Sequence, residues 1–272
     1  MLRRTLTALG LGAIALPAII YGGWFYFLLI AIFLAGGAWE YLRLYRAVQV
    51  EPNEMVTIGG VLIIATARFF FAEAAIPSFV LLVLLAMTVH LIAFERGRDQ
   101  AALDFTVTVA GIVYLGWLGS YLLDLRQLPQ GNWWWMIVLP CVWGGDTGAF
   151  SIGAAYGKHK MTPRLSPKKS WEGYFAGLFT SVLVGAFFAY AFSSLGRQPL
   201  GGLITPFQGA LLGLVIGALT PLGDLGESML KRQSGLKDSS NVFPGHGGFL
   251  DRIDTWIWGA ALGFFFIHFF IL

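Results

Sequence analysis

Charged side chains are scarce in this sequence. Only 12% of the 272 residues are Asp, Glu, Lys or Arg, whereas soluble domains average about 25%. Hydrophobic residues make up 57%, and the mean hydropathy is +0.70. A single cysteine, Cys141, excludes an intramolecular disulfide framework. Because the apolar runs are too long for the strands of a membrane barrel, the composition predicts an all-α polytopic membrane protein.

Polar interruptions divide the apolar sequence into about nine candidate transmembrane helices. The first run, 9–38, contains Pro17 and the pair Gly22–Gly23, which favour two short helices joined by a tight turn. One long tilted helix is the alternative. The nine predicted helices cover residues 9–21, 24–38, 56–72, 76–94, 103–123, 133–156, 174–194, 205–222 and 254–272.

The cations predict an orientation for these helices. With nine spans, all but three of the 18 Lys and Arg residues fall on one side, the exceptions being Arg68, Arg126 and Arg197. Because cytoplasmic loops carry the excess of Lys and Arg, this distribution predicts N-in and C-out. In a membrane protein such cations report orientation and contact with anionic lipid, so the net charge of +3 does not indicate a nucleic-acid partner.

We expect two parts in the chain. Residues 1–130 form an N-terminal part with about five spans, in which the segment from Glu40 to Glu54 is a polar connection. Residues 131–272 form a C-terminal catalytic part with about four spans and two charged loops, 157–173 and 223–254. The predicted topology places both loops on the cytoplasmic side.

Acidic residues in the second charged segment have helical spacing. Asp224, Glu227, Ser228 and Lys231 follow the spacing i, i+3, i+4, i+7, which places them on one face of a helix. Two carboxylates on one face can hold a hard cation such as Mg²⁺, together with waters and substrate phosphates. Pairing of the two acids with Lys231 and Arg232 on a solvated face is the alternative reading.

Three further acids lie near or within apolar segments. Asp251 and Asp254 are spaced i, i+3 at the start of the last predicted helix, and Asp146 lies in or at the end of the sixth. Acids at such depth are costly and indicate function. The first two can also complement the positive N-terminus of their helix.

Cations and glycines accompany these acids. The segment 157–173 is the most basic of the chain, and the turn 244–248 contains three glycines that allow a ligand to approach the backbone closely. The turn is not a Walker A loop, and neither a hydrolase elbow nor zinc-ligand spacing is present. Acids for a metal, many cations and a glycine turn at a membrane face suit a polyphosphate and a lipid phosphate as substrates.

The segment 228–254 resembles the full signature of the phosphatidate cytidylyltransferase family. Residues 146–149 and 166–173 resemble other motifs of that family, with Ser170 where Thr is common. The strong resemblance covers about 140–254. The residues that match the signature are Ser228, Leu230, Lys231, Arg232, Lys237, Asp238, Ser240, Phe243, Pro244, His246, Gly247, Gly248, Phe249, Asp251, Arg252, Ile253 and Asp254.

The resemblance implies the reaction CTP + phosphatidate → CDP-diacylglycerol + pyrophosphate in phospholipid biosynthesis. It implies Mg²⁺ held by Asp224 and Asp251, with a monovalent cation such as K⁺ as an additional ion. A multi-pass protein of a bacterial-type inner or plasma membrane, active as a homodimer, is also implied. Gly209, Gly213 and Gly217 form a small-residue face that admits a neighbouring helix, within the chain or in a second copy.

Roles for the matched residues follow from the charge of the reactants. A phosphate monoester with a second pKa of about 6 is largely dianionic at neutral pH, so it needs no general base. We assign the metal to Asp224 and Asp251, with Asp146, Glu227 and Asp254 as further candidates. His246 bonds a phosphate oxygen or protonates the leaving pyrophosphate, and both roles stay open. The phosphate-binding candidates are Lys168, Lys169, Lys231, Arg232, Lys237 and Arg252, and Ser228, Asp238, Gly247 and Gly248 are further substrate-binding candidates.

Other functions remain open from the residues alone. A CTP-dependent lipid-alcohol kinase, or a cytidylyltransferase for another lipid phosphate, has the same requirements. A secondary transporter or lipid flippase also contains intramembrane acids, but the charges gather on one predicted side and the motifs show no inverted repeat. If the site is confined to the C-terminal part, Arg43→Ala should barely change turnover.

Overall fold

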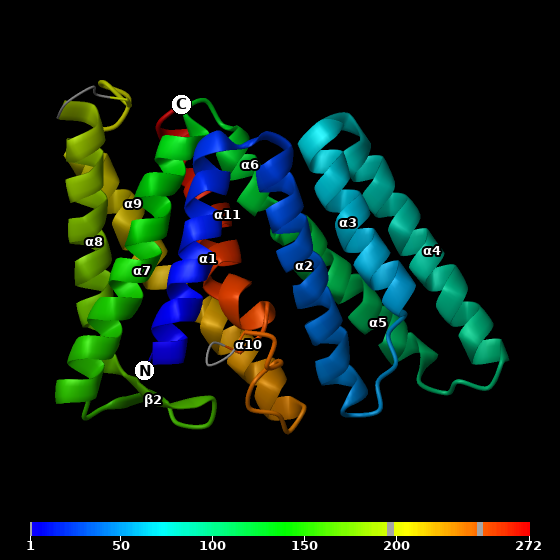
Figure 1. The fold of residues 1–272 in the computed structure, drawn as a ribbon. Helices are drawn as coiled ribbons and strands as arrows, with labels where there is room; N and C mark the ends of the chain where they lie inside the picture. The colour runs from blue at the N-terminus through cyan, green and yellow to red at the C-terminus, as the bar shows by residue number, and fades with distance from the viewer. Residues whose placement is uncertain (1, 195–198, 244–246) are drawn as a thin grey trace. The chain divides into compact units, whose positions relative to one another are not determined.

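The computed structural model describes residues 2–194, 199–243 and 247–272, and side chains before residue 10 and at residue 11 are not described. Figure 1 follows the elements in chain order. The helices of the first half are α1 (Leu2–Tyr21), α2 (Gly23–Arg46), α3 (Glu54–Phe70), η1 (Ala72–Ala74), α4 (Ala75–Glu95), α5 (Ala101–Gly111), η2 (Ile112–Leu118) and α6 (Tyr121–Gln127). The second half contains α7 (Gly131–Tyr156), β1 (Lys160–Thr162), β2 (Ser166–Ser170), α8 (Trp171–Ser194), α9 (Pro206–Leu219), α10 (Pro221–Gln233) and α11 (Leu250–Phe270).

The chain is a predominantly helical membrane protein. Within the described residues, six helical stretches are long and apolar enough to cross a membrane: 23–46, 72–95, 101–127, 171–194, 206–233 and 250–270. The break expected at Gly22–Gly23 is confirmed, because α1 ends at Tyr21 and both glycines have positive φ, 69° and 60°. Only glycine adopts such backbone angles without strain.

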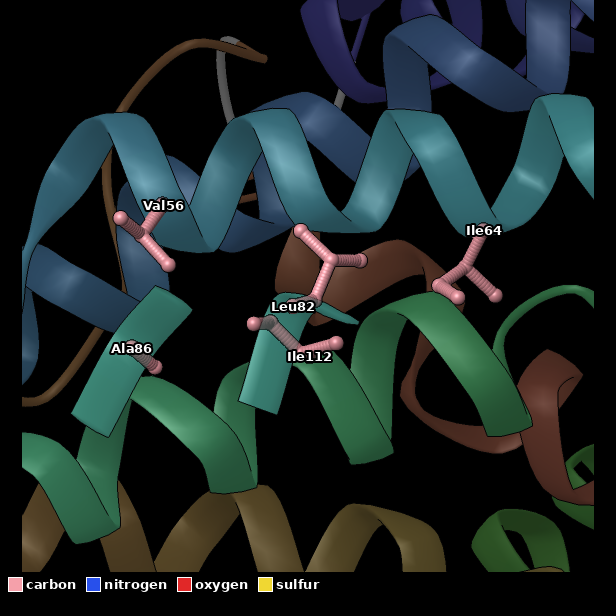
Figure 2. Packing of buried hydrophobic residues seen from close by; sticks show 5 residues of the cluster. All are labelled: Val56, Ile64, Leu82, Ala86 and Ile112. Carbon is pink, nitrogen blue, oxygen red and sulfur yellow. The ribbon is translucent and has the colours of Figure 1, made fainter. Parts of the chain in front are cut away.

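The chain divides into two compact units. The first contains residues 1–124 and 230–253, and the second contains 125–229 and 254–272. In the first unit, apolar side chains of α3, α4 and η2 form a buried cluster (Figure 2) of Val56, Ile64, Leu82, Ala86 and Ile112. In membranes such close packing, rather than exclusion of water, holds helices together.

The second unit is built on close contacts of α8 with α7 and α9. A Cβ atom on Gly177 of α8 would lie 2.7 Å from the Gly145 carbonyl oxygen of α7. A Cβ on Gly213 of α9 would lie 2.2 Å from the Ser181 carbonyl oxygen of α8. The small-residue face of α9 therefore packs against α8 within the same chain.

Two sequence-based boundaries are corrected by the structure. The segment from Glu40 to Arg46, predicted as part of a polar connection, continues α2, because its apolar residues Tyr41, Leu42 and Leu44 are buried along the helix. Both ends of the predicted charged loop 223–254 are helical: α10 reaches Gln233 and α11 begins at Leu250.

The first charged loop, predicted at 157–173, contains a small antiparallel hairpin. Strands β1 and β2 pair Lys160 with Ser170 and Thr162 with Ser166. The hairpin leads directly into α8, which starts at Trp171. Lys168 and Lys169 are therefore held on a strand.

Candidate functional site

Three carboxylates gather in the second unit where α10 and α11 begin. Asp224 and Glu227 lie one turn apart on α10, and Asp254 lies in the first turns of α11. One oxygen of each carboxylate lies within 4.8 Å of the others. Glu227 and Asp254 are only 3% and 6% exposed, while Asp224 is half-buried.

The three carboxylates repel one another, so a cation bound between them would be stabilised. Two unit charges about 4 Å apart repel by roughly 4 kcal/mol at an effective dielectric constant of 20. A divalent ion or protonation removes that repulsion. Carboxylate oxygens are the ligands that Mg²⁺ prefers, so the donor set of Asp224, Glu227 and Asp254 fits Mg²⁺.

A glycine brings the two acidic helices together. A Cβ atom on Gly223 would lie 2.6 Å from the Asp254 carbonyl oxygen and 2.7 Å from the Trp258 ring. Any side chain at this position would push α10 away from α11. Gly223 therefore permits the approach that places Asp254 beside the α10 acids, a role that its sequence context did not reveal.

A cavity of about 510 Å³ opens beside this cluster in the second unit. Its walls come from α7, the hairpin, α8, α9 and α10. Apolar and glycine residues form one part of the lining, such as Ala149 and Phe150 of α7 and Gly177 of α8. The polar lining consists of Asp146, Lys160, Lys168, Lys169, Ser170, Tyr174, Thr220 and Asp224.

Lys169 connects the hairpin to α10. Its ammonium group forms an ion pair with Asp224 and lies 3.5 Å from the Pro221 carbonyl oxygen. The exposed Lys168 lines the same cavity. The cavity thus combines an apolar wall with three cations, Lys160, Lys168 and Lys169, and with the edge of the acidic cluster. This arrangement suits an amphiphilic anion.

A second polar centre surrounds Asp251 in the first unit. The Lys231 ammonium lies 2.6 Å from Asp251 Oδ1, and Asp251 Oδ2 accepts from the Gly248 amide at 2.8 Å. The Ser239 hydroxyl lies 2.5 Å from the same Oδ2. Gly247 has a φ of 75°, and a Cβ there would lie 2.5 Å from Oδ2. The backbone and side chains around Asp251 thus pack closely against its carboxylate.

Glu40 of α2 belongs to this centre, although its sequence context predicts a polar connection. It is fully buried, and its carboxylate accepts from the Phe249 amide at 2.9 Å and the Leu250 amide at 2.7 Å. The hydroxyl groups of Ser239 and Ser240 also contact it. The sequence feature that could have identified Glu40 is its position as an acid between Trp39 and Tyr41 in an apolar run. An ionisable residue within a membrane segment indicates a functional site.

The other predicted site residues are distributed over both units. In the first unit, Lys237, Asp238 and Arg232 are exposed, and Arg252 is half-buried. Ser228 is half-buried on α10. His246 lies outside the described residues. Asp224 and Asp251 belong to different units, so their sharing of one metal ion stays a prediction.

Gly248→Ala is expected to reduce activity at least tenfold. A Cβ atom on Gly248 would lie 2.1 Å from Glu40 Oε1 and 2.3 Å from Oε2, so the carboxylate and the backbone must separate. Overpacking of this kind costs about 1–3 kcal/mol. Gly59→Ala is the matched control, because nothing lies within 4 Å of the added methyl group. Equal turnover and equal melting temperatures of the two purified variants would contradict the steric argument.

Comparisons with known proteins agree with the resemblance of the motifs. The family model described as "Cytidylyltransferase family" matches residues 2–270. A protein of Synechocystis sp. named phosphatidate cytidylyltransferase is 32% identical, over 94% of this chain and 92% of the relative. Proteins of the same name from Pseudomonas aeruginosa and Bacillus subtilis are 36% and 29% identical. Their alignments cover 93% and 84% of this chain, and 92% and 86% of the relatives.

Proposed function

Since the chain belongs to the cytidylyltransferase family, we propose that it transfers CMP from CTP to phosphatidate. The products are CDP-diacylglycerol and pyrophosphate. The observation that carries this proposal is similarity to three phosphatidate cytidylyltransferases over 84–94% of the chain. The match spans both units, so it includes the acidic cluster as well as the Asp251 centre.

The reaction replaces one phosphoanhydride oxygen by another. A phosphate oxygen of phosphatidate forms a bond to the α-phosphorus of CTP, and the bond from that phosphorus to the pyrophosphate oxygen breaks. The nucleophile is already an anion, so the main obstacle is repulsion between two polyanions. Catalysis of this kind depends on positioning and on neutralisation of charge.

We assign the positioning to the residues that line the cavity and the two polar centres. Asp224, Glu227 and Asp254 would hold Mg²⁺, which when bound supplies neutralisation of phosphate charge. Lys168 and Lys169 would bind phosphate oxygens at the cavity. A K⁺ ion and a homodimer stay expectations from the family resemblance.

We infer nine spans, with the N-terminus in the cytoplasm and the C-terminus outside. Six stretches meet the length and hydropathy expected of a span, and α1, α3 and α7 are assigned as the other three. The distribution of Lys and Arg supports this orientation. The proposed site then faces the cytoplasm, where CTP is available, in a bacterial-type inner membrane.

The fate of each CTP phosphate tests the proposal. Purified protein is incubated with Mg²⁺, phosphatidate and CTP labelled at either the α- or the γ-phosphate. We expect the α-label in the lipid and the γ-label in pyrophosphate. In a parallel reaction with diacylglycerol in place of phosphatidate, a lipid kinase would instead transfer the γ-label to the lipid hydroxyl and release CDP. Absence of any labelled product, under conditions where the protein is folded, would favour a transporter and contradict the proposal.

A further inference from the structure

Glu40 makes its hydrogen bonds to a segment about 200 residues further along the chain. The first four amides of a helix have no acceptor within the helix, and Glu40 accepts from Leu250, the first residue of α11, and from Phe249 before it. The positive end of a helix also stabilises a nearby carboxylate. The start of α11 in the first unit is therefore held by a side chain of α2.

The Ser239 hydroxyl lies between two carboxylates. It is 2.8 Å from Glu40 Oε2 and 2.5 Å from Asp251 Oδ2. A hydroxyl has one hydrogen to donate, so the Ser239 hydroxyl can donate to only one of the two carboxylates at a time. A shift of the Glu40 carboxylate therefore changes the hydrogen bond that Ser239 offers to Asp251. The Ser239 amide is also directed at Asp251 Oδ2, at 3.3 Å.

We propose that Glu40 is a positioning residue for the cytidylyl transfer, which sets the orientation of the Asp251 carboxylate through Ser239 and through the first turn of α11. Glu40 itself contacts no reacting atom in this proposal. The inference rests on the proposed function, because it assigns Asp251 to the reaction. It extends the site into the N-terminal half, to one helix turn before the exposed Arg43.

Apolar contacts between α2 and the same segment make the role testable. A Cβ on Gly36 would lie 2.4 Å from the Phe249 ring, and a Cβ on Gly37 would lie 2.9 Å from Ile253 Cδ1. Phe33 packs against Phe249 with 5.4 Å between ring centroids. These contacts remain when Glu40 is changed, so loss of the carboxylate should loosen the polar groups more than the packing.

Substitutions of two adjacent serines can distinguish a positioning role of Glu40 from a purely structural one. Ser239 and Ser240 are both buried and each contacts Glu40, but only the Ser239 hydroxyl also contacts Asp251. Ser239→Ala is expected to lower kcat about 10–100-fold, the range found for groups that orient metal ligands, the role predicted for Asp251. Ser240→Ala also removes one hydroxyl, but this hydroxyl contacts Glu40 and not Asp251, so the substitution is expected to lower kcat clearly less than Ser239→Ala does.

Hydrogen exchange measures the role of Glu40 without relying on activity. Glu40→Gln offers one acceptor oxygen in place of two, so the amides of Phe249 and Leu250 should exchange at least about tenfold faster. The matched control is Glu95→Gln, the same change at an exposed position on α4, which should leave exchange in this segment unchanged. Glu40→Asp retains the charge and should recover part of the kcat lost in Glu40→Gln.

The outcomes distinguish the inference from the proposed function. Wild-type protein that forms no CDP-diacylglycerol contradicts the function, whereas the exchange experiment still reports on the α2–α11 contact. Equal changes in kcat for Ser239→Ala and Ser240→Ala, whether large or negligible, overturn the positioning role. Unchanged exchange at Phe249 and Leu250 in Glu40→Gln overturns it as well. If Glu40→Gln does not fold, the comparison of kcat between Ser239→Ala and Ser240→Ala tests the positioning role.

Discussion

Asp224→Asn should lower turnover at least about 100-fold while the protein still inserts and folds. Asparagine has the shape of aspartate but no charge, so the cluster with Glu227 and Asp254 retains its packing and loses one of three carboxylates. Loss of about 3 kcal/mol of transition-state stabilisation corresponds to roughly this factor. The variant should also require a higher Mg²⁺ concentration for half-maximal activity. CTP-dependent formation of CDP-diacylglycerol, titrated with Mg²⁺, measures both effects.

The melting temperature of Asp224→Asn tests the metal site independently of turnover. Asp224→Asn also removes the ion pair with Lys169, but both side chains are partly exposed, so that loss costs little. Without divalent ions, the three carboxylates repel one another, so the variant should melt at the same temperature as wild type or higher in a chelator. Ligand binding stabilises the folded state by mass action; added Mg²⁺ should therefore raise the melting temperature of wild type more than that of the variant. Asp99→Asn, at an exposed loop position, is the matched control. Near wild-type activity in Asp224→Asn would remove Asp224 from the metal site.

Asp251→Asn is also expected to reduce turnover at least about 100-fold, by the same conversion of about 3 kcal/mol. Its effect on stability should differ from that of Asp224→Asn. Asp251 lies 2.6 Å from the Lys231 ammonium, and the two side chains are only 10% and 12% exposed. Removal of one partner of a largely buried ion pair costs about 3 kcal/mol. We therefore expect a lower melting temperature both in a chelator and in Mg²⁺.

A double substitution separates stability from chemistry at this centre. Asp251→Asn combined with Lys231→Met removes both charges. This should recover stability, because no largely buried charge is left without its partner. Turnover should remain as low as in Asp251→Asn. Recovery of turnover together with stability would mean that Asp251 serves only the fold, and would contradict its proposed part in the reaction.

The helices and the functional class could be predicted from local sequence. Scarce charge and long apolar runs indicated membrane helices, and the family signature in 228–254 indicated a cytidylyltransferase, to whose family the chain belongs. The predicted end of α2 was wrong because Glu40 and Arg43 were read as polar connection, whereas the apolar face of the helix continues past them. The burial of Glu40 could not be predicted either, because a single acid creates no periodic pattern in the sequence.

Run length, helical spacing and motif order are properties of neighbouring residues. The membrane class, most of the helices and the list of acids and cations therefore follow from local sequence. Which of these side chains meet depends on the packing of the helices in three dimensions. Asp254 lies with Asp224 and Glu227 because Gly223 admits α11. Glu40 joins partners 199 to 210 residues away, since contacts between distant segments depend on how helices pack and not on the spacing of residues along one of them.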